Sequence, residues 1–140
     1  VAVCQYDSAR VTWQNSSETV CKRITEYAYA VVKDKPSFHI SFILDVSPNC
    51  DCWDVNDYPM VPDIGFAASF DPVALDKACA DLVMNAPALP GSIVCEENNN
   101  FDMRGKDKFQ HAHPDTHWQS GIEHGVKTGL GNSEYELVTV

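Results

Sequence analysis

Two cysteines separated by a single residue, Cys50 and Cys52, are the side chains of this sequence best suited to chemistry. They follow a strongly β-prone run at 39–44 and lie in a segment rich in Pro, Asn and Asp. Thiolates bind zinc, iron or Cu(I), whereas carboxylates prefer harder ions. The segment can therefore hold a single metal ion, or it can be a well-packed turn with structural thiols. The carboxylates expected near the thiols belong to Asp45, Asp51, Asp54, Asp57 and Asp63.

A Cys-x-Cys pair cannot complete a tetrahedral metal site without further ligands. The sequence contains no second closely spaced pair, so the remaining ligands must come from Cys4, Cys95 or the histidines. We expect the sulfurs of Cys50 and Cys52 to face one partly exposed pocket. At least one carboxylate is expected to share that pocket, from Asp45, Asp54 or Asp63.

Four histidines in the last third of the chain are a weaker candidate for a metal site. They are His111, His113, His117 and His124. Pro114 interrupts this segment, so the closely spaced histidines are not expected to share one helix face. We favour the interpretation in which the segment is a turn, and Asp115 or Thr116 caps the last helix.

Asp71 is predicted to be structural. It stands directly before Pro72, at the start of a helical pattern, and this combination is typical of an N-cap followed by proline at the first helical position. The side chain of Asp71 is expected to accept a hydrogen bond from the backbone of Val73 or Ala74. The negative charge then leaves no place for an anion at this helix start.

The elements that must position these residues alternate along the chain. Helices are predicted at 18–33 and 72–85 and from about 116 to 126; strands at 39–44 and 64–69, with shorter ones at 8–14, 92–95 and 134–140. This order implies an α/β layered domain with a mixed or mostly parallel sheet flanked by helices. The near-continuous apolar run at 39–44 predicts a strand covered on both faces. Ligands of such sheets collect at the carboxyl ends of strands, where Cys50 and Asp71 are both expected.

The composition limits the classes of function that this chain can have. At 140 residues the chain is expected to be one α/β domain, and because it begins with Val1 it looks like part of a longer protein. A formal charge of −10 argues against binding of nucleic acid or anionic membranes. No apolar run approaches the ~20 residues that cross a bilayer. Six cysteines at low density suggest a reducing, cytoplasmic setting.

Four stretches resemble a large uncharacterised family whose members are generally called iron–sulfur centre proteins. They are 45–52, 61–65, 69–78 and 129–137, in the same order along the chain as in the family. Members commonly contain a ferredoxin-like insert with two cysteine motifs, each binding a four-iron cluster. The resemblance implies that this chain is the C-terminal half of such a protein, and that residues 1–14 are a remnant of the insert.

Cys4 is similar to the final cluster cysteine of that insert, although Gln5 stands where a proline usually follows. The other cluster cysteines of the family are not in this sequence. The resemblance therefore implies an iron–sulfur cluster in the full-length protein, none bound by this chain alone, and a missing N-terminal or ferredoxin-like segment as partner.

Three functions remain open from the sequence. The first is a domain of an iron–sulfur redox or electron-transfer protein, with a metal or ligand site at the Cys50/Cys52 loop. The second is a non-catalytic structural half that completes a larger α/β protein. The third is an enzyme with an acidic active site at the sheet edge, in which Asp63 or Asp71 pairs with a histidine.

Overall fold

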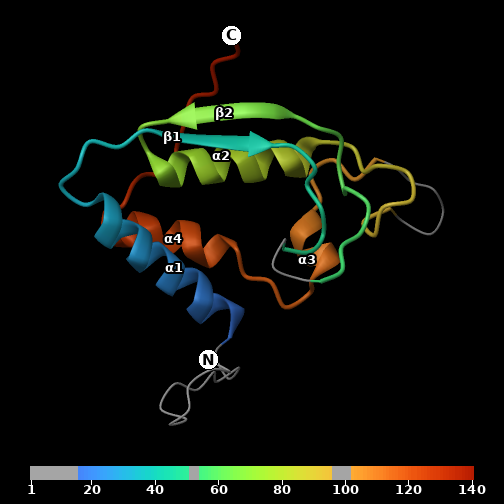
Figure 1. Ribbon diagram of the computed structural model, residues 1–140, viewed down its shortest axis with the longest axis horizontal. Helices are drawn as coiled ribbons and strands as arrows, with labels where there is room; N and C mark the ends of the chain where they lie inside the picture. The colour runs from blue at the N-terminus through green and yellow to red at the C-terminus, as the bar shows by residue number, and fades with distance from the viewer. Residues whose placement is uncertain (1–15, 51–53, 96–101) are drawn as a thin grey trace.

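The computed structural model describes residues 16–50, 54–95 and 102–140 (Figure 1). In chain order the elements are α1 (Ser17–Val32), β1 (His39–Ile43), β2 (Gly65–Ser69), α2 (Pro72–Asn85), α3 (Lys108–Ala112) and α4 (Gln119–Thr128). The helices predicted at 18–33 and 72–85, and the strands predicted at 39–44 and 64–69, are thereby confirmed. The protein combines helices with a sheet, as an α/β class requires.

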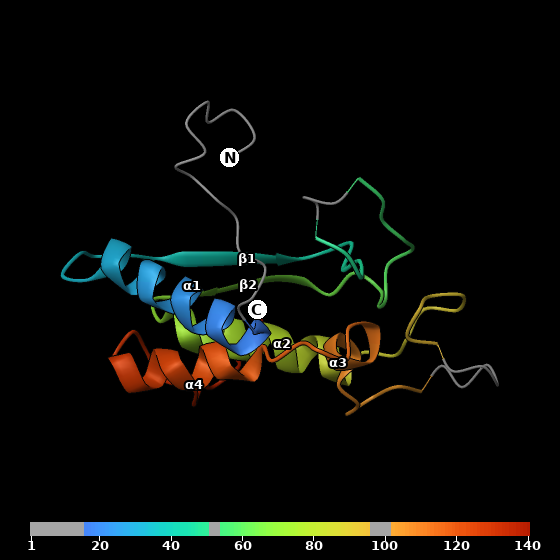
Figure 2. The ribbon, with the colours of Figure 1, turned by 90° about the horizontal axis from the view of Figure 1, so that it is seen from below.

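The sheet of the described residues consists of β1 and β2, which pair antiparallel. His39 lies opposite Ser69 and Ile43 opposite Gly65. A mixed or mostly parallel sheet is therefore not shown. Parallel neighbours need a crossover connection, usually a helix, and the described part of the connection at 44–64 contains none. Figures 1 and 2 show the described helices on one side of this sheet, so within the described residues no helix gives the second face the cover that was predicted.

Helix α2 packs against the covered face of the sheet, and its start is as predicted. The side chain of Asp71 accepts hydrogen bonds from the backbone N–H groups of Val73 and Ala74, and Pro72 occupies the first turn. The core beneath joins the end of β1 to α2 and to the segments that follow each of them. Its buried members are Ile43, Met60, Val61, Val83, Ala88, Val94 and Met103.

Helix α4 carries two glycines where it meets α1 and α2. A Cβ atom at Gly121 would lie 3.5 Å from Thr25 Oγ1, and one at Gly125 would lie 2.8 Å from Val73 Cγ2. Thr25, which is buried, donates its hydroxyl hydrogen bond to the carbonyls of Cys21 and Gly121. Small residues and one hydroxyl therefore bring these three helices together.

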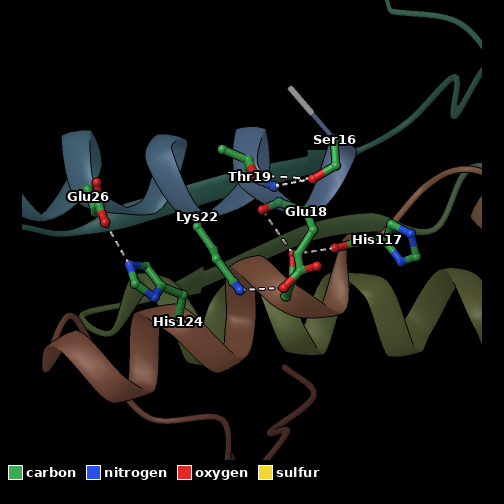
Figure 3. Close-up of polar contacts among 8 residues, drawn as sticks. Ser16, Glu18, Thr19, Lys22, Glu26, His117 and His124 are labelled. Carbon is green, nitrogen blue, oxygen red and sulfur yellow. Dashed lines mark hydrogen bonds and ion pairs between the residues drawn. The ribbon is translucent and has the colours of Figure 1, made fainter. Parts of the chain in front are cut away.

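The apolar stripe of α1 does not form the buried face that its spacing predicts. Of the apolar residues at helical spacing, Ala28 and Val32 are half-buried, and the others are exposed, namely Val20, Ile24, Tyr27 and Val31. Polar contacts also join α1 to α4, as Figure 3 shows for Glu26 Oε1 and His124 Nε2, which lie 3.0 Å apart. The prediction fails because amphipathic spacing identifies an apolar stripe but not the neighbour that covers it.

Lys108, at the start of α3, is fully buried. Its ammonium donates hydrogen bonds to the carbonyls of Met84 (2.7 Å) and Met103 (2.8 Å). Met84 belongs to the last turn of α2, where the helix dipole favours a cation. Burial lowers the pKa of the Lys108 ammonium. This cation therefore joins the end of α2 to the segment before α3, a role that no local sequence signal reveals.

Three smaller predictions are corrected. Strands were predicted at 92–95 and 134–140, but residues 92–95 form turns and residues 134–140 do not pair with a strand. Helix α4 begins at Gln119, after Trp118 in the N-cap position, so neither Asp115 nor Thr116 caps it. The predicted strand at 8–14 lies outside the described residues. None of the helices that the structure describes combines the length and the apolar character needed to span a bilayer.

Candidate functional site

The loop between β1 and β2, residues 44–64, is closed at its base by backbone and side-chain hydrogen bonds. The N–H of Ile64 donates to the carbonyl of Ile43 (2.9 Å). Next to this bond, the N–H of Asp45 donates to Asp63 Oδ1 (2.9 Å). Asp45 has a φ of 47°, in the left-handed region. The two aspartates proposed as metal ligands therefore meet here, both exposed, and one oxygen of Asp63 is already engaged.

Further out, the amide of Asn56 joins the two limbs of this loop. Its Oδ1 accepts from the N–H of Asn49 (3.3 Å), and its Nδ2 donates to Ser47 Oγ (2.9 Å). The polar residues that made this segment a candidate metal site therefore stabilise the shape of the loop. Cys50 follows directly after Asn49 and is exposed.

His113 lies against the same loop. Its Nε2 is 2.7 Å from the carbonyl oxygen of Pro48, so Nε2 is the donor, and Nδ1 is the ring nitrogen that could bind a metal. His113 is also the C-cap of α3, and its N–H donates to the carbonyl of Phe109. The sequence placed this histidine in a turn but gave no signal that the turn touches the loop, 65 residues earlier.

The remaining histidines and cysteines are spread over the fold. His117 and His124 contact α1 through Ser17 and Glu26. Cys21 and Cys79 are half-buried on α1 and α2, and burial raises the pKa of the Cys79 thiol. Within residues 16–50, 54–95 and 102–140, no three His, Cys, Asp or Glu side chains gather in a way that could hold a metal ion.

Two of the predicted site residues, Cys4 and Cys52, lie outside the described residues. The shared pocket of Cys50 and Cys52, and the role of Cys4 toward a cluster, therefore stay predictions. Asp54 is exposed on the same loop as Cys50.

Asp71 does not share an edge with the Cys50 loop, contrary to the prediction. Because the strands run antiparallel, the loop follows the end of β1, whereas Asp71 follows the end of β2 beside His39. The register has five residue pairs, so four steps along a strand separate its two ends, which is roughly 13 Å. In the described part of the chain, the hydrogen bonds of the Asp63 and Asp71 carboxylates go to backbone N–H groups and to Asn132 rather than to a histidine, so the acid–base pair stays a prediction.

A cavity of about 230 Å³ lies between α1, α2 and α4 and was not predicted. Its walls are mostly apolar, with Trp118 and Ile122 among them, and Asp76 is the acidic residue in its lining. Neighbouring groups withdraw the Asp76 carboxyl from part of its water and raise its pKa, an effect that His39 opposes. The cavity is separate from the Cys50 loop, and none of the loop residues lines it.

A family described as a domain of unknown function (DUF362) matches residues 3–81, which is more than half of the chain. The chain belongs to this family. No curated protein and no solved structure matches the chain. The DUF362 match spans the Cys50 loop, both strands and most of α2, ending at Asp81.

Asp81 links the DUF362 segment to the C-terminal residues. Its Oδ2 accepts a hydrogen bond from the Tyr135 hydroxyl (2.8 Å) and also pairs with Lys77. Burial, and then Asp81, raise the pKa of Tyr135 from 10.0 to about 12. A raised pKa in the folded state contributes stability that is complete below pH 10.0 and lost as the pH rises through 12.

We expect one of the five tyrosines to ionise late when the native protein is titrated by ultraviolet absorbance, near pH 12. Tyr135→Phe should remove this late step, because it removes the phenol that hydrogen-bonds to Asp81. Asp81→Asn should move the step toward lower pH by removing the negative charge. A native protein whose tyrosines all ionise together, with its circular dichroism intact, would contradict the assignment.

Proposed function

We propose that the chain is a domain of an iron–sulfur redox or electron-transfer protein, and that the loop at 44–64 contacts a metal or a cluster-bearing segment. The observation that supports this best is the contact of His113 with Pro48, which places an imidazole on the loop that presents Cys50. Ligand histidines commonly donate their second ring N–H to a backbone carbonyl, as His113 does. Thiolate and imidazole together suit zinc or iron.

The proposed metal ligands are Cys50 and Cys52, with the carboxylates of Asp45 and Asp63 at the base of the loop. His113 adds a nitrogen that the sequence alone did not select. Cys4 would serve the cluster of the full-length protein. Thiolate ligands must lose their protons to bind, so affinity is expected to fall as the pH is lowered.

The test is a titration of the reduced chain with Co²⁺ under anaerobic conditions, followed by thiolate-to-metal charge-transfer absorption. We expect one equivalent to bind, and we expect Cys50→Ser to weaken binding and lower the thiolate absorption, because one of the two proposed thiolates is then lost. His113→Gln should weaken binding by roughly 10–100-fold. Cys21→Ser is the matched control, because Cys21 lies on α1, and it should bind as the unaltered chain does. Equal binding by Cys50→Ser and the control would contradict a site at this loop.

A second role, as a structural half of a larger α/β protein, is supported by a different observation. The sheet face opposite α2 carries exposed aromatic and aliphatic side chains. Contiguous exposed apolar patches of more than about a few hundred Å² mark interaction surfaces in soluble proteins. In this role the chain completes a layered fold by packing that face against further polypeptide.

A further inference from the structure

The uncovered side of the sheet has a defined set of residues, which we call the aromatic face: Phe38, Ile40, Phe42, Phe66, Ala68 and Phe70. Along β1 and β2, alternate residues point to this side, and the residues between them point toward α2. Phe42 and Phe66 are 67% and 69% exposed, and Ile40 is 56% exposed. Figures 1 and 2 show no described helix over this side, and the C-terminal residues 135–138 and Val140 border it at Phe66 and Ala68.

The aromatic face has the shape of two ridges with a trough between them. One ridge is the cross-strand pair Phe42–Phe66, with ring centroids 4.9 Å apart and the rings nearly perpendicular. The other is the pair Phe38–Phe70, also 4.9 Å apart. Between them lies the pair of Ile40 and Ala68, where alanine leaves the surface low. Phe38 and Phe42 stand four residues apart, so the ridges are about 13 Å from each other.

This relief is complementary to itself. A ridge of one copy fits the trough of another, and a twofold axis makes the contact reciprocal. The antiparallel strand pair is compatible with such an axis, since its register is centred on Ser41 and Ala67. A ridge that enters the trough on its Ala68 side also meets the neighbouring rings of the other copy, with the edge-to-face contacts that aromatic side chains prefer.

The area of the aromatic face favours a second copy as the occupant, and the charge distribution permits one. With about 150–250 Å² for a whole aromatic side chain, the aromatic face exposes roughly 500–700 Å². Standard interfaces bury about 800 Å² per partner, so this face and its rim are sufficient. Each chain has a formal charge of −10, and like charges oppose association. None of the six residues of the aromatic face is charged, so two copies can meet here without burying acid.

We propose that the aromatic face is the isologous interface of a homodimer, in which two sheets pack face to face. The proposal rests on the structural role proposed above and names its partner as a second copy of this chain. The dimer forms a sandwich with two sheets inside and the helices of each copy outside, so each sheet gains the cover that it lacks.

Sedimentation equilibrium of the reduced chain tests this. We expect a dimer at about 10 µM, and we expect Phe42→Ser with Phe66→Ser to raise Kd by on the order of 100-fold or more. Both rings are largely exposed in one copy, so this variant should keep its fold, and its circular dichroism should show that. The matched control is Ile24→Ser with Tyr27→Ser, which removes two exposed apolar residues of α1. It should remain dimeric.

A monomeric unaltered chain, or a dimer that survives in the Phe42/Phe66 variant, would overturn the proposal. Binding of a dye to exposed apolar surface distinguishes failure of the dimer proposal from failure of the structural role. A monomer whose dye binding is lost in the Phe42/Phe66 variant keeps a docking face and excludes the second copy. A monomer whose dye binding is the same in both proteins rejects the docking face as well.

Discussion

Lys108→Ala is expected to destabilise the protein by about 3 kcal/mol or more. The substitution removes a fully buried side chain and leaves a cavity. It also deprives the carbonyls of Met84 and Met103 of a charged donor. Part of this loss is offset, because the variant no longer has the cost of burying an ammonium group away from water. Urea unfolding followed by circular dichroism measures the change.

Lys108→Met separates packing from hydrogen bonding, because methionine keeps most of the volume and makes neither bond. We expect it to cost less than Lys108→Ala. The pKa of Lys108 is lowered in the folded state, so the unfolded chain binds more protons up to its ordinary pKa of 10.5. Stability should therefore rise with pH in that window in the unaltered chain, and this contribution should vanish in Lys108→Met. Lys127→Ala, at an exposed position, is the control; a Lys108→Ala variant no less stable than Lys127→Ala would contradict the argument.

Asp71→Ala is the second large effect, at roughly 2–4 kcal/mol. A helix cap alone is worth about 1 kcal/mol. Here Oδ1 accepts from Val73 and Ala74, while Oδ2 accepts from the backbone and side-chain nitrogens of Asn132 (2.8 and 3.3 Å). The carboxylate therefore caps α2 and also holds the turn after α4. Thermal unfolding by calorimetry measures the loss.

Asp71→Asn tests this double role. Asparagine caps well, but its Nδ2 would face the two donors of Asn132, so we expect an intermediate loss rather than the small one of a simple cap. Gly131→Ala should resemble Asp71→Ala, because its Cβ would lie 2.0 Å from Asp71 Oδ1. Ala30→Gly, at an exposed position of α1, is the reference, because its loss of stability measures a purely local change in a helix. If Asp71→Asn were neutral, the Asn132 contact would contribute nothing.

The local part of the fold was predictable. Asp71 followed by Pro72 has a cap and a preset φ within two residues, so the start of α2 needed no tertiary information. The strand at 39–44 was recognisable from its β-prone residues. How that strand pairs was not, because residue periodicity says nothing about strand direction. One consequence was that the Cys50 loop and Asp71, expected at one edge, lie at opposite ends.

The site was predictable only as a loop. The meeting of Asp45 and Asp63 follows from closure of the hairpin-like connection, and both residues had been selected. His113 and Lys108 act through contacts with segments far away in sequence, which no window of neighbouring residues contains. Residues 134–140 illustrate the converse, since their β-prone alternation is real but strands form only where an edge pairs with them.

The packing of α1 against α4 has a consequence for how the chain is made. Glu26 and His124, which meet across these helices, are 98 residues apart. At synthesis rates of about 5–20 residues per second, the partner of α1 leaves the ribosome roughly 5–20 s after α1 itself. The strands and α2 can assemble during that interval, so α1, although it is synthesised before them, is among the last of these elements to be fixed in place.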